Sequence, residues 1–286
     1  MTHQAALIIK NDSVLCHNGV PVLFNISTNQ LADLGAISLA FGEILPKTAS
    51  YGVISHVIDL DRALACGLVG AFGSGYTTTT HPCLELISFR QLAYHCDSQT
   101  AEQLSRAIQL VLWQNDHRFC SRCGTPTKMH HSENAMICPA CRHHAYPRVQ
   151  PCIIVAIIRN HPTNHKPQIL LAKHHRHADK GVYGLIAGFV EAGESLESAL
   201  CRETLEEVNV TIREPRYISS QPWPYPTNLM LGFIAHYDGG VITPQTDEIS
   251  HAQFFDFHDL PAIPEVGTIA RALICQAAKE CGIALT

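Results

Sequence analysis

The sequence predicts an α/β protein in three parts, on the basis of three observations. Residues 1–115 show short apolar runs broken by turn residues, which is typical of a β-rich domain, and they end in a helical pattern. Residues 116–149 hold two closely spaced Cys-x-x-Cys pairs. Residues 150–286 alternate apolar runs with segments of helical spacing, which predicts a central sheet flanked by helices.

Two local patterns support the β-rich N-terminal domain. Asn18-Gly19 stands between the apolar runs Val14–Leu15 and Val20–Phe24, a pattern typical of a tight β-hairpin. Apolar residues then recur at helical spacing, which predicts a helix over 99–115 with Ser98 as its cap. We expect this helix to lead out of the first domain.

The composition argues against several classes of protein. A net charge of −5 gives no strongly basic character for duplex binding. The start of the chain lacks the pattern of an export signal, and no apolar run approaches the ~20 residues of a membrane helix. We therefore expect a cytoplasmic protein with no membrane partner, in which the eight cysteines outside the two pairs are buried free thiols. The histidine-rich run at 174–177 is expected to be a solvated loop without metal.

The two cysteine pairs predict a structural zinc site. Cys120 and Cys123 form one pair, and Cys138 and Cys141 form the other. Two such turns direct four thiolates at one point, which is the tetrahedral set that Zn²⁺ prefers, and this closed set leaves no position for water. We predict one structural Zn²⁺ per chain. The ribbon also has a mildly basic surface that would suit nucleic acid, formed by Arg122, Lys128, His130, His131, Arg142 and Arg148.

The C-terminal pattern predicts the strands of a sheet. The continuous apolar run Pro151–Ile158 is typical of a strand that is buried on both faces. Helical spacing predicts a final helix over 268–280. Further strands are expected at 168–172, 184–188, 216–219, 229–236 and 254–257.

A helix rich in carboxylates is expected between two of these strands. Ser195 and the apolar positions after it predict a helix that contains Glu203, Glu206 and Glu207. Residues three and four apart share one face of a helix, so the three carboxylates converge. A hard divalent cation such as Mg²⁺ would neutralise them through oxygen ligands. A solvated acidic face is the alternative for any single Glu-Glu pair.

The pattern around this helix resembles the Nudix box, the signature of hydrolases that cleave nucleoside diphosphates linked to another group. The matching positions are Gly188, Glu194, Arg202, Glu203, Glu206 and Glu207. The resemblance implies a Nudix fold with a mixed sheet, in which Glu194 pairs with Arg202 and orients it.

Two positions depart from the Nudix pattern. Thr204 replaces an apolar residue, and its hydroxyl can bond to a carbonyl one turn earlier. Asn209 replaces a glycine just past the helix, where a left-handed backbone is expected and Asn is the usual substitute.

A proline-rich segment after the box bears on the substrate. Ser220–Asn228 has the sequence SQPWPYPTN, and its alternating prolines predict an extended loop that displays aromatic rings. The segment resembles the SQPWPFPxS array of the NADH pyrophosphatase family of Nudix hydrolases, with Tyr225 for Phe and Asn228 for the final Ser. The cysteine pairs, Tyr146–Arg148 and Val266–Arg271 resemble the same family.

The resemblance implies a role for each matched position. Glu203 and Glu207 would bind catalytic Mg²⁺ or Mn²⁺ with Glu206 beside them, and the Ala187 carbonyl and Glu248 would join the site. Substrate contacts would come from every part of the chain, namely Arg90, Tyr146, Phe189, Gln221, Pro222, Trp223, Pro224, Tyr225, Pro226, Thr227, Asn228 and Ala270.

The resemblance also implies the reaction and the partners. The chain would hydrolyse the pyrophosphate bond of NADH or NAD⁺ to NMN(H) and AMP, and it would remove the NAD cap from RNA 5′ ends, as a homodimer. Tyr146 and Phe189 would stack on the nicotinamide or another base. One alternative is a Nudix hydrolase of another dinucleotide or ADP-sugar, which Tyr225 and Asn228 leave open. The other is a zinc-ribbon nucleic-acid-binding protein with an inactive Nudix domain, against which the intact carboxylates argue.

Overall fold

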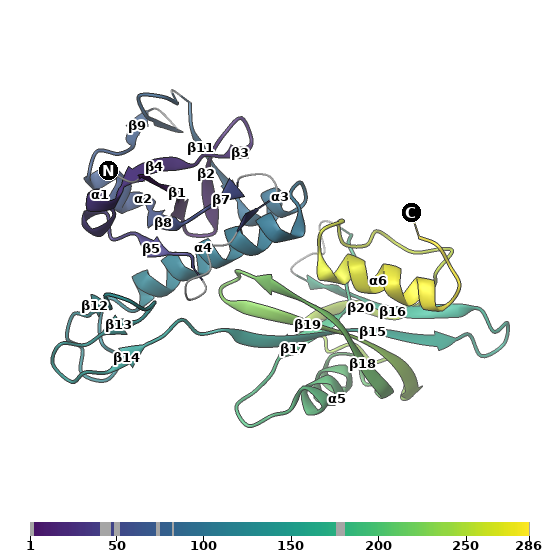
Figure 1. Cartoon of the computed structure of the whole chain (residues 1–286). Coiled ribbons are helices and arrows are strands. Elements are labelled where there is room, and N and C mark those ends of the chain that lie inside the picture. Colours follow the sequence, from purple (N-terminus) through teal and green to yellow (C-terminus); the bar gives the residue numbers. More distant parts are fainter. Residues whose placement is uncertain are drawn as a thin grey trace. The chain divides into compact units, whose positions relative to one another are not determined.

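The computed structural model describes residues 3–40, 47–48, 52–72, 75–81, 83–175 and 181–285. The chain divides into two compact units (Figure 1), one of residues 1–149 with 222–227 and the other of residues 150–221 with 228–286. Each unit has its own sheet and its own apolar clusters. None of the helices in these described ranges is long and apolar enough to cross a membrane.

A seven-stranded sheet forms the centre of the first unit. Its order is β11-β2-β1-β8-β5, with β3 beside β2 and β4 beside β1. Its strands are β1 (His3–Lys10), β2 (Ser13–His17), β3 (Val20–Pro21), β4 (Phe24–Ser27), β5 (Ile37–Ser38), β8 (His56–Asp59) and β11 (Glu85–Ser88). Two small sheets accompany it, formed by β6 (Lys47–Thr48) with β7 (Gly52–Val53) and by β9 (Gly70–Phe72) with β10 (Gly75–Thr77).

Helices cover both faces of this sheet. Alternate residues of a strand point to opposite faces, so Leu7 and Ile9 pack with α3 and α4, whereas Ala6 and Ile8 pack with α1 and α2. The helices are α1 (Thr28–Asp33), α2 (Leu60–Ala65), α3 (Phe89–Ala93) and α4 (Ser98–Asp116). The first unit is therefore rich in strands, as expected, but its core depends on helices as well.

Two predictions for this unit can be compared with the structure. The hairpin at Asn18-Gly19 is confirmed, because His17 pairs with Val20 and both turn residues have positive φ, at 50° and 80°. The predicted helix corresponds to α4, but Ser98 is not its cap. The side chain of Asp97 accepts a hydrogen bond from the Thr100 N–H and caps the helix one residue earlier. Asp and Ser are similarly good caps, so sequence alone does not choose between neighbours.

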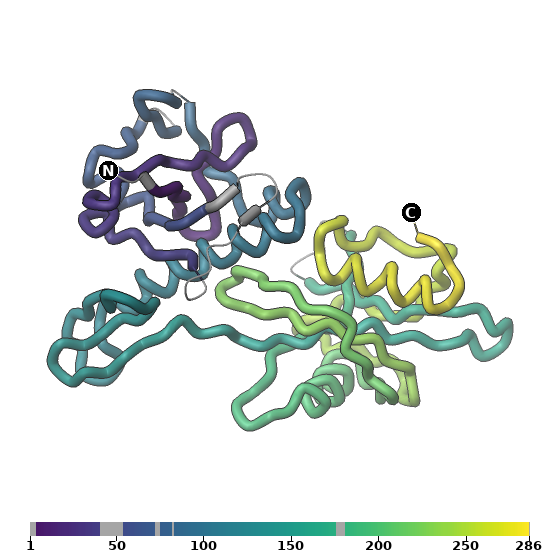
Figure 2. The backbone as a smooth tube through the Cα atoms, viewed as in Figure 1, coloured from purple at the N-terminus to yellow at the C-terminus, as the bar shows by residue number. Residues whose placement is uncertain are grey.

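The cysteine-bearing segment folds into a small three-stranded sheet of order β12-β13-β14. Its backbone turns back on itself between α4 and the first strand of the second unit (Figure 2). The strands are β12 (Lys128–Met129), β13 (Met136–Ile137) and β14 (His144–Ala145).

A mixed sheet forms the centre of the second unit, as the Nudix resemblance implies. Its order is β18-β19-β15-β16-β20, with β17 beside β15. β15 runs parallel to β19 and antiparallel to β16 and β17. The strands are β15 (Gln150–Asn160), β16 (Pro167–His174), β17 (Ile186–Phe189), β18 (Thr211–Trp223), β19 (Asn228–Gly239) and β20 (Ile249–Asp256).

Two helices lie on opposite faces of this sheet (Figure 1). Ile153 and Val155 of β15 pack with α5 (Leu196–Val208), whereas Ile154 and Ala156 pack with α6 (Ile269–Glu280). Because both faces of β15 are covered, its sequence is continuously apolar, which confirms the prediction for a strand buried on both sides.

The strand before the proline-rich array is longer than expected. β18 ends only at Trp223 and β19 begins at Asn228, so the prediction of a loop was wrong for Ser220–Trp223 and for Asn228; Pro224–Thr227 forms the turn. β18 is an edge strand of the sheet, and proline is compatible with an edge strand because every second backbone N–H of such a strand faces away from its only neighbour.

Candidate functional site

Local interactions define both ends of the carboxylate helix α5. The Ser195 hydroxyl accepts a hydrogen bond from the Ser198 N–H at 3.1 Å and caps the start. Asn209 adopts the left-handed conformation (φ 55°, ψ 42°) at the end, and its side-chain amide donates to the Val241 carbonyl at 3.0 Å. The Thr204 hydroxyl donates to the Cys201 carbonyl at 3.2 Å. Both departures from the Nudix pattern therefore adopt the local structure predicted for them.

Gly188 lets the carboxylate of Glu203 approach strand β17 closely. A Cβ atom at this position would lie 1.9 Å from the carboxyl carbon of Glu203, so any side chain here would displace this carboxylate. The carboxylate of Glu203 thus rests against the backbone of β17, the strand that also carries Ala187 and Phe189.

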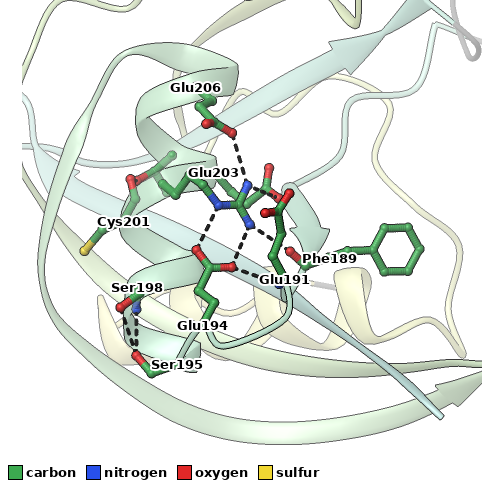
Figure 3. A network of polar contacts seen from close by, with 10 residues as sticks. Phe189, Glu191, Glu194, Ser195, Ser198, Cys201, Glu203 and Glu206 are labelled. Carbon is green, nitrogen blue, oxygen red and sulfur yellow. Dashed lines mark hydrogen bonds and ion pairs between the residues drawn. The ribbon is translucent and has the colours of Figure 1, made fainter. Parts of the chain in front are cut away.

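Arg202 lies at the centre of the polar network (Figure 3). Its guanidinium binds both oxygens of Glu194, with Nε···Oε1 at 2.8 Å and Nη2···Oε2 at 2.9 Å. Nη1 donates to Glu203 at 2.8 Å and to Glu206 at 3.1 Å, and Nη2 also donates to the Phe189 carbonyl at 2.8 Å. The pairing of Arg202 with Glu194 was expected, whereas the bonds to the other two glutamates were not.

The charges around Arg202 are unevenly compensated. Hydrogen bonds from Arg202 lower the pKa of Glu194 to about 2, so this carboxylate is ionised and tightly held. Burial raises the pKa of Glu203, although Arg202 opposes the shift. Glu203 is therefore a carboxylate whose ionised form gains from an additional cation.

The number of carboxylates exceeds what one guanidinium can neutralise. Glu207 is only 3% exposed, and Glu206 lies at the solvent side with 56% of its side chain exposed. Arg202 thus binds three carboxylates, those of Glu194, Glu203 and Glu206, and Glu207 follows Glu203 by one turn of the same helix. Hard divalent cations such as Mg²⁺ prefer oxygen ligands to thiols and imidazoles, so a carboxylate cluster with excess negative charge is a suitable site for one.

A backbone loop brings Glu248 toward the same end of α5. The Thr243 N–H donates to the Val208 carbonyl at 3.0 Å, and the Gln245 N–H donates to the Glu207 carbonyl at 2.8 Å. Glu248 ends this loop, directly before β20, and is exposed. The loop that carries the fifth predicted carboxylate is thus fastened to the helix that carries the others.

The four ribbon cysteines form a compact thiol cluster. Their sulfur atoms all lie within 4.8 Å of one another. Sγ of Cys123 is 3.5 Å from that of Cys138, and Sγ of Cys141 is 3.6 Å from those of Cys120 and Cys123. A tetrahedral Zn²⁺ with Zn–S of about 2.3 Å needs sulfurs about 3.8 Å apart. The set fits a closed structural zinc site.

Arg90 and the proline-rich array meet inside the first unit. Trp223 and Tyr225 pack around Phe89, with ring centroids 5.6 and 6.4 Å from it. The Arg90 guanidinium lies over both array rings, 5.9 Å from the centroid of Trp223 and 5.3 Å from that of Tyr225. The Arg90 N–H also donates to the Tyr225 hydroxyl at 3.2 Å. Burial raises the pKa of Tyr225, so its hydroxyl stays protonated.

Gln221 connects the array strand to the start of α6. Its side-chain nitrogen donates to the Gly267 carbonyl at 2.8 Å, and its side-chain oxygen accepts from the Ile269 N–H at 2.8 Å. Both ends of the amide therefore bind backbone, beside the predicted substrate residue Ala270. This geometry suits a residue that positions the neighbouring segment.

The remaining predicted substrate residues differ in accessibility. Phe189, in the second unit, is 49% exposed, and its ring points away from the carboxylates (Figure 3). Tyr146, in the first unit, is 50% exposed, and its hydroxyl donates to Glu133 at 3.1 Å. Asn228 is buried at the start of β19, and its Oδ1 accepts no hydrogen bond from the described residues. Pro224 is buried, Pro222 and Thr227 are half-buried, and Pro226 is exposed.

Some contacts were invisible in the sequence. Phe89 supports the array from 134 positions earlier in the chain, and nothing in its own neighbourhood signals this. The loop predicted for the histidine-rich run was wrong at His174, which ends β16; His175 follows the strand, and residues 176 and 177 lie outside the described residues. The expectation of buried free thiols was wrong for Cys66, Cys83 and Cys201, which are exposed.

Comparisons with known proteins agree with this geometry. The NUDIX domain model matches residues 150–276, and the NADH pyrophosphatase zinc ribbon model matches residues 115–146. A protein of Stutzerimonas stutzeri (strain A1501) named NAD-capped RNA hydrolase NudC is 45% identical over 185 residues, which span 65% of this chain and 64% of that protein. The protein of the same name from Salmonella heidelberg (strain SL476) is 42% identical over 65% of this chain and 69% of its own length.

Solved structures of Nudix hydrolases are similar over part of the chain. One of them, the NUDIX hydrolase from Nitrosomonas europaea, covers 58% of this chain and 94% of its own, at 24% identity and a TM-score of 0.45. The family assignment rests on the sequence relationships alone, which include both the ribbon and the carboxylate helix. The chain therefore belongs to the NudC family of Nudix hydrolases, whose catalytic domain follows a zinc ribbon.

Proposed function

We propose that this chain hydrolyses the pyrophosphate bond of NADH and NAD⁺, giving NMN(H) and AMP, and that it removes the NAD cap from RNA 5′ ends. The observation that carries the proposal is the set of four carboxylates on and beside α5, of which Glu194, Glu203 and Glu206 bind Arg202 and Glu207 is buried. Support for the substrate comes from the relatives named NAD-capped RNA hydrolase and from the array Ser220–Asn228.

The carboxylates would hold Mg²⁺ or Mn²⁺. Glu203 and Glu207 are the proposed ligands, with Glu206 beside them and with the Ala187 carbonyl and Glu248 completing the set. When bound, the cation would neutralise phosphate oxygens and lower the pKa of the attacking water.

The residues of the chain would keep this site in its reactive geometry. Glu194 fixes the guanidinium of Arg202 through two hydrogen bonds, and Arg202 in turn fixes the carboxylates of Glu203 and Glu206. A carboxylate held in this way does not have to reorganise when the phosphate charge develops, which is the general advantage of a preorganised site.

Aromatic rings would hold the base and ribose ends of the substrate. The exposed rings of Phe189 and Tyr146 suit stacking on a nicotinamide or adenine ring. Arg90 places its positive charge over Trp223 and Tyr225 and would attract an anionic dinucleotide. Stacking does not require a free ribose end, so RNA could continue from the adenosine side.

We also propose the wider organisation that the family resemblance implies. The chain would act in the cytoplasm as a homodimer, with residues 116–149 as a zinc module between an N-terminal domain (1–115) and a catalytic domain (150–286). The Cys₄ set has no open position, which supports a structural role for zinc.

A side-by-side hydrolysis experiment tests the proposal. NADH, NAD⁺, ADP-ribose and NAD-capped RNA are incubated with the full chain and either Mg²⁺ or Mn²⁺, and the products are separated. We expect NMN(H) and AMP from the dinucleotides and 5′-monophosphate RNA from the capped transcript. Turnover of ADP-ribose far above NADH would favour a hydrolase of ADP-sugars. Absence of turnover on all four substrates would favour the nucleic-acid-binding alternative.

A further inference from the structure

The small sheet of the zinc ribbon has one buried face and one exposed face. Met129, Met136 and Ala145 pair across its three strands and pack against the apolar cluster of the first unit. The neighbouring cross-strand row is Lys128, Ile137 and His144, and it must point the other way because successive residues of a strand alternate. Lys128 and His144 are accordingly exposed.

A row of rings continues along this exposed face. His130 is two residues beyond Lys128, and Tyr146 is two residues beyond His144, so both extend the same side. The ring centroids of His131 and His130 are 4.3 Å apart, those of His130 and His144 are 6.2 Å apart, and those of His144 and Tyr146 are 6.2 Å apart. We call these four side chains the ring row.

Hydrogen bonds hold the ring row in place. The Ser132 N–H donates to Nδ1 of His130 at 3.3 Å, which fixes the orientation of this imidazole. The Tyr146 hydroxyl donates to Glu133 at 3.1 Å. The side-chain amide of Asn134 donates to the Ser38 carbonyl at 3.1 Å and ties the same loop to the first unit. The rings are therefore ordered before any partner binds.

The charge around the ring row is positive. Residues 116–149 contain five Arg and Lys residues and two acidic residues, Asp116 and Glu133, in a chain whose net charge is −5. All five cations are exposed, namely Arg118, Arg122, Lys128, Arg142 and Arg148. A local excess of positive charge beside stacked rings favours a partner with both aromatic bases and phosphates.

We propose that the ring row and Lys128 bind single-stranded RNA, namely the nucleotides that follow the NAD cap. This proposal rests on the proposed function. Small sheets that bind single-stranded RNA use exposed aromatic side chains for the bases and cations for the backbone, and the ribbon has both on one face. A second metal site fits less well, because in the part of the chain that the structure describes the cysteines alone form a cluster with ligating distances.

Chain continuity connects this face to the proposed cap site. Tyr146, at one end of the ring row, is also a residue proposed to stack on the base of the dinucleotide, and only three residues separate it from the start of β15. RNA leaving a base stacked on Tyr146 would next meet the ring of His144 and then that of His130.

RNA binding by the zinc-loaded full chain, measured without Mg²⁺ or Mn²⁺, tests the proposal. The probe is a fluorescent, uncapped single strand of about 12 nucleotides with a 5′-monophosphate, a length within the range that one such module covers. We expect His130→Ala with His144→Ala to weaken binding roughly fivefold or more, which corresponds to the loss of one stacked base. Lys128→Ala should lower the slope of log affinity against log salt concentration by about 0.7.

Matched controls make the test specific. His95→Ala, at an exposed histidine that follows α3, and Lys279→Ala, at an exposed lysine in the last turn of α6, should leave binding unchanged. Unchanged affinity in the double variant, equal losses in the controls, or equally tight binding of a duplex of the same sequence would each overturn the proposal. Zinc content and thermal midpoint are measured for every variant. If the double variant loses zinc, the test rests on Lys128→Ala, whose slope of log affinity against log salt concentration is compared with that of the native chain.

NADH hydrolysis by the same variants separates this inference from the proposed function. We expect the double variant and Lys128→Ala to lose activity on NAD-capped RNA. Both variants should keep their activity on NADH, because Tyr146 is unchanged in both. If the native chain hydrolyses NADH but the substitutions leave RNA binding unchanged, the RNA-binding role of this face is refuted and the proposed function stands. If the native chain binds RNA through this face but does not hydrolyse NADH, the proposed function is refuted and the assignment of the RNA-binding face stands.

Discussion

The ribbon holds a cluster of four cysteines, and α5 with the loop before it holds a cluster of four glutamates, three of which bind Arg202. The surroundings of the two clusters differ. The thiols lie within 22 residues of sequence, in two tight turns, and face one another. The carboxylates come from a loop and a helix, already share a guanidinium, and leave Glu206 exposed. Like charges brought together need a cation in either case.

The difference indicates what each site can do. A closed thiol set surrounds its metal completely, so binding energy goes into the fold. An open carboxylate set with an internal arginine keeps its shape without the metal and has room for phosphate oxygens and water. Loss of the first site should therefore affect stability, and loss of a ligand from the second should affect chemistry.

The largest expected effect is on stability, from removing two buried zinc ligands. We predict that Cys120→Ser with Cys138→Ser abolishes zinc binding and destabilises the protein by several kcal/mol, because structural zinc sites have binding free energies of about 10–16 kcal/mol. Zinc content is measured by elemental analysis and stability by thermal unfolding. Cys66→Ser with Cys83→Ser, at two exposed free cysteines, is the matched control. A stable, active, zinc-free double variant would refute the structural role.

The next effect is on catalysis, at the buried carboxylate. We predict that Glu207→Gln lowers metal-dependent NADH hydrolysis roughly 100-fold or more, because a bound cation supplies several kcal/mol of transition-state stabilisation. The amide has the same shape, so the thermal midpoint should change little. Glu197→Gln, in the exposed first turn of the same helix, is the control and should keep full activity. Normal turnover in Glu207→Gln would contradict the assignment of this ligand.

The smallest effect concerns the pH dependence of stability through Glu194. Arg202 lowers the pKa of Glu194 from its ordinary value of 4.5 to about 2 in the folded protein. A lowered pKa contributes stability above the unfolded value, and this contribution is lost as the pH falls from about 4.5 toward 2. We predict that Glu194→Gln is less stable than the native chain near neutral pH and that the two converge in acid.

Denaturant unfolding of both proteins between about pH 7 and pH 2.5 measures this difference. Exposed Glu197→Gln should follow the native curve throughout. A constant gap between Glu194→Gln and the native chain across the whole range would show that Glu194 stabilises by packing and not by its charge.

Patterns that are local in sequence predicted most of the second unit and the zinc ribbon. Helical periodicity placed the three glutamates of α5 together, because residues three and four apart must share a face. Fixed spacing placed the four cysteines together, and the left-handed Asn209 followed from the end of the helix. Each of these features depends on a few consecutive turns of backbone, whose geometry is nearly constant.

The contacts of the array could not be predicted in this way. Trp223 and Tyr225 pack on Phe89 and Arg90, which lie more than 130 positions earlier in the chain. Gln221 binds the backbone of Gly267 and Ile269, and no local pattern distinguishes that role from contact with a substrate. β18 continues through Pro222, which is possible because β18 lies at the edge of the sheet. The order of the strands in the sheet, and not the local sequence, places it there.

The sequence by itself therefore determined the cysteine cluster, the carboxylate cluster and the fold of the domain that carries the carboxylates. Only the tertiary structure decided which distant side chains support the array, and only strand pairing brought His130, His144 and Tyr146 into one row on the ribbon. The physical reason is the range of the interactions. Helix periodicity and turn spacing act within a few residues, whereas register and packing depend on chain segments that meet only after folding.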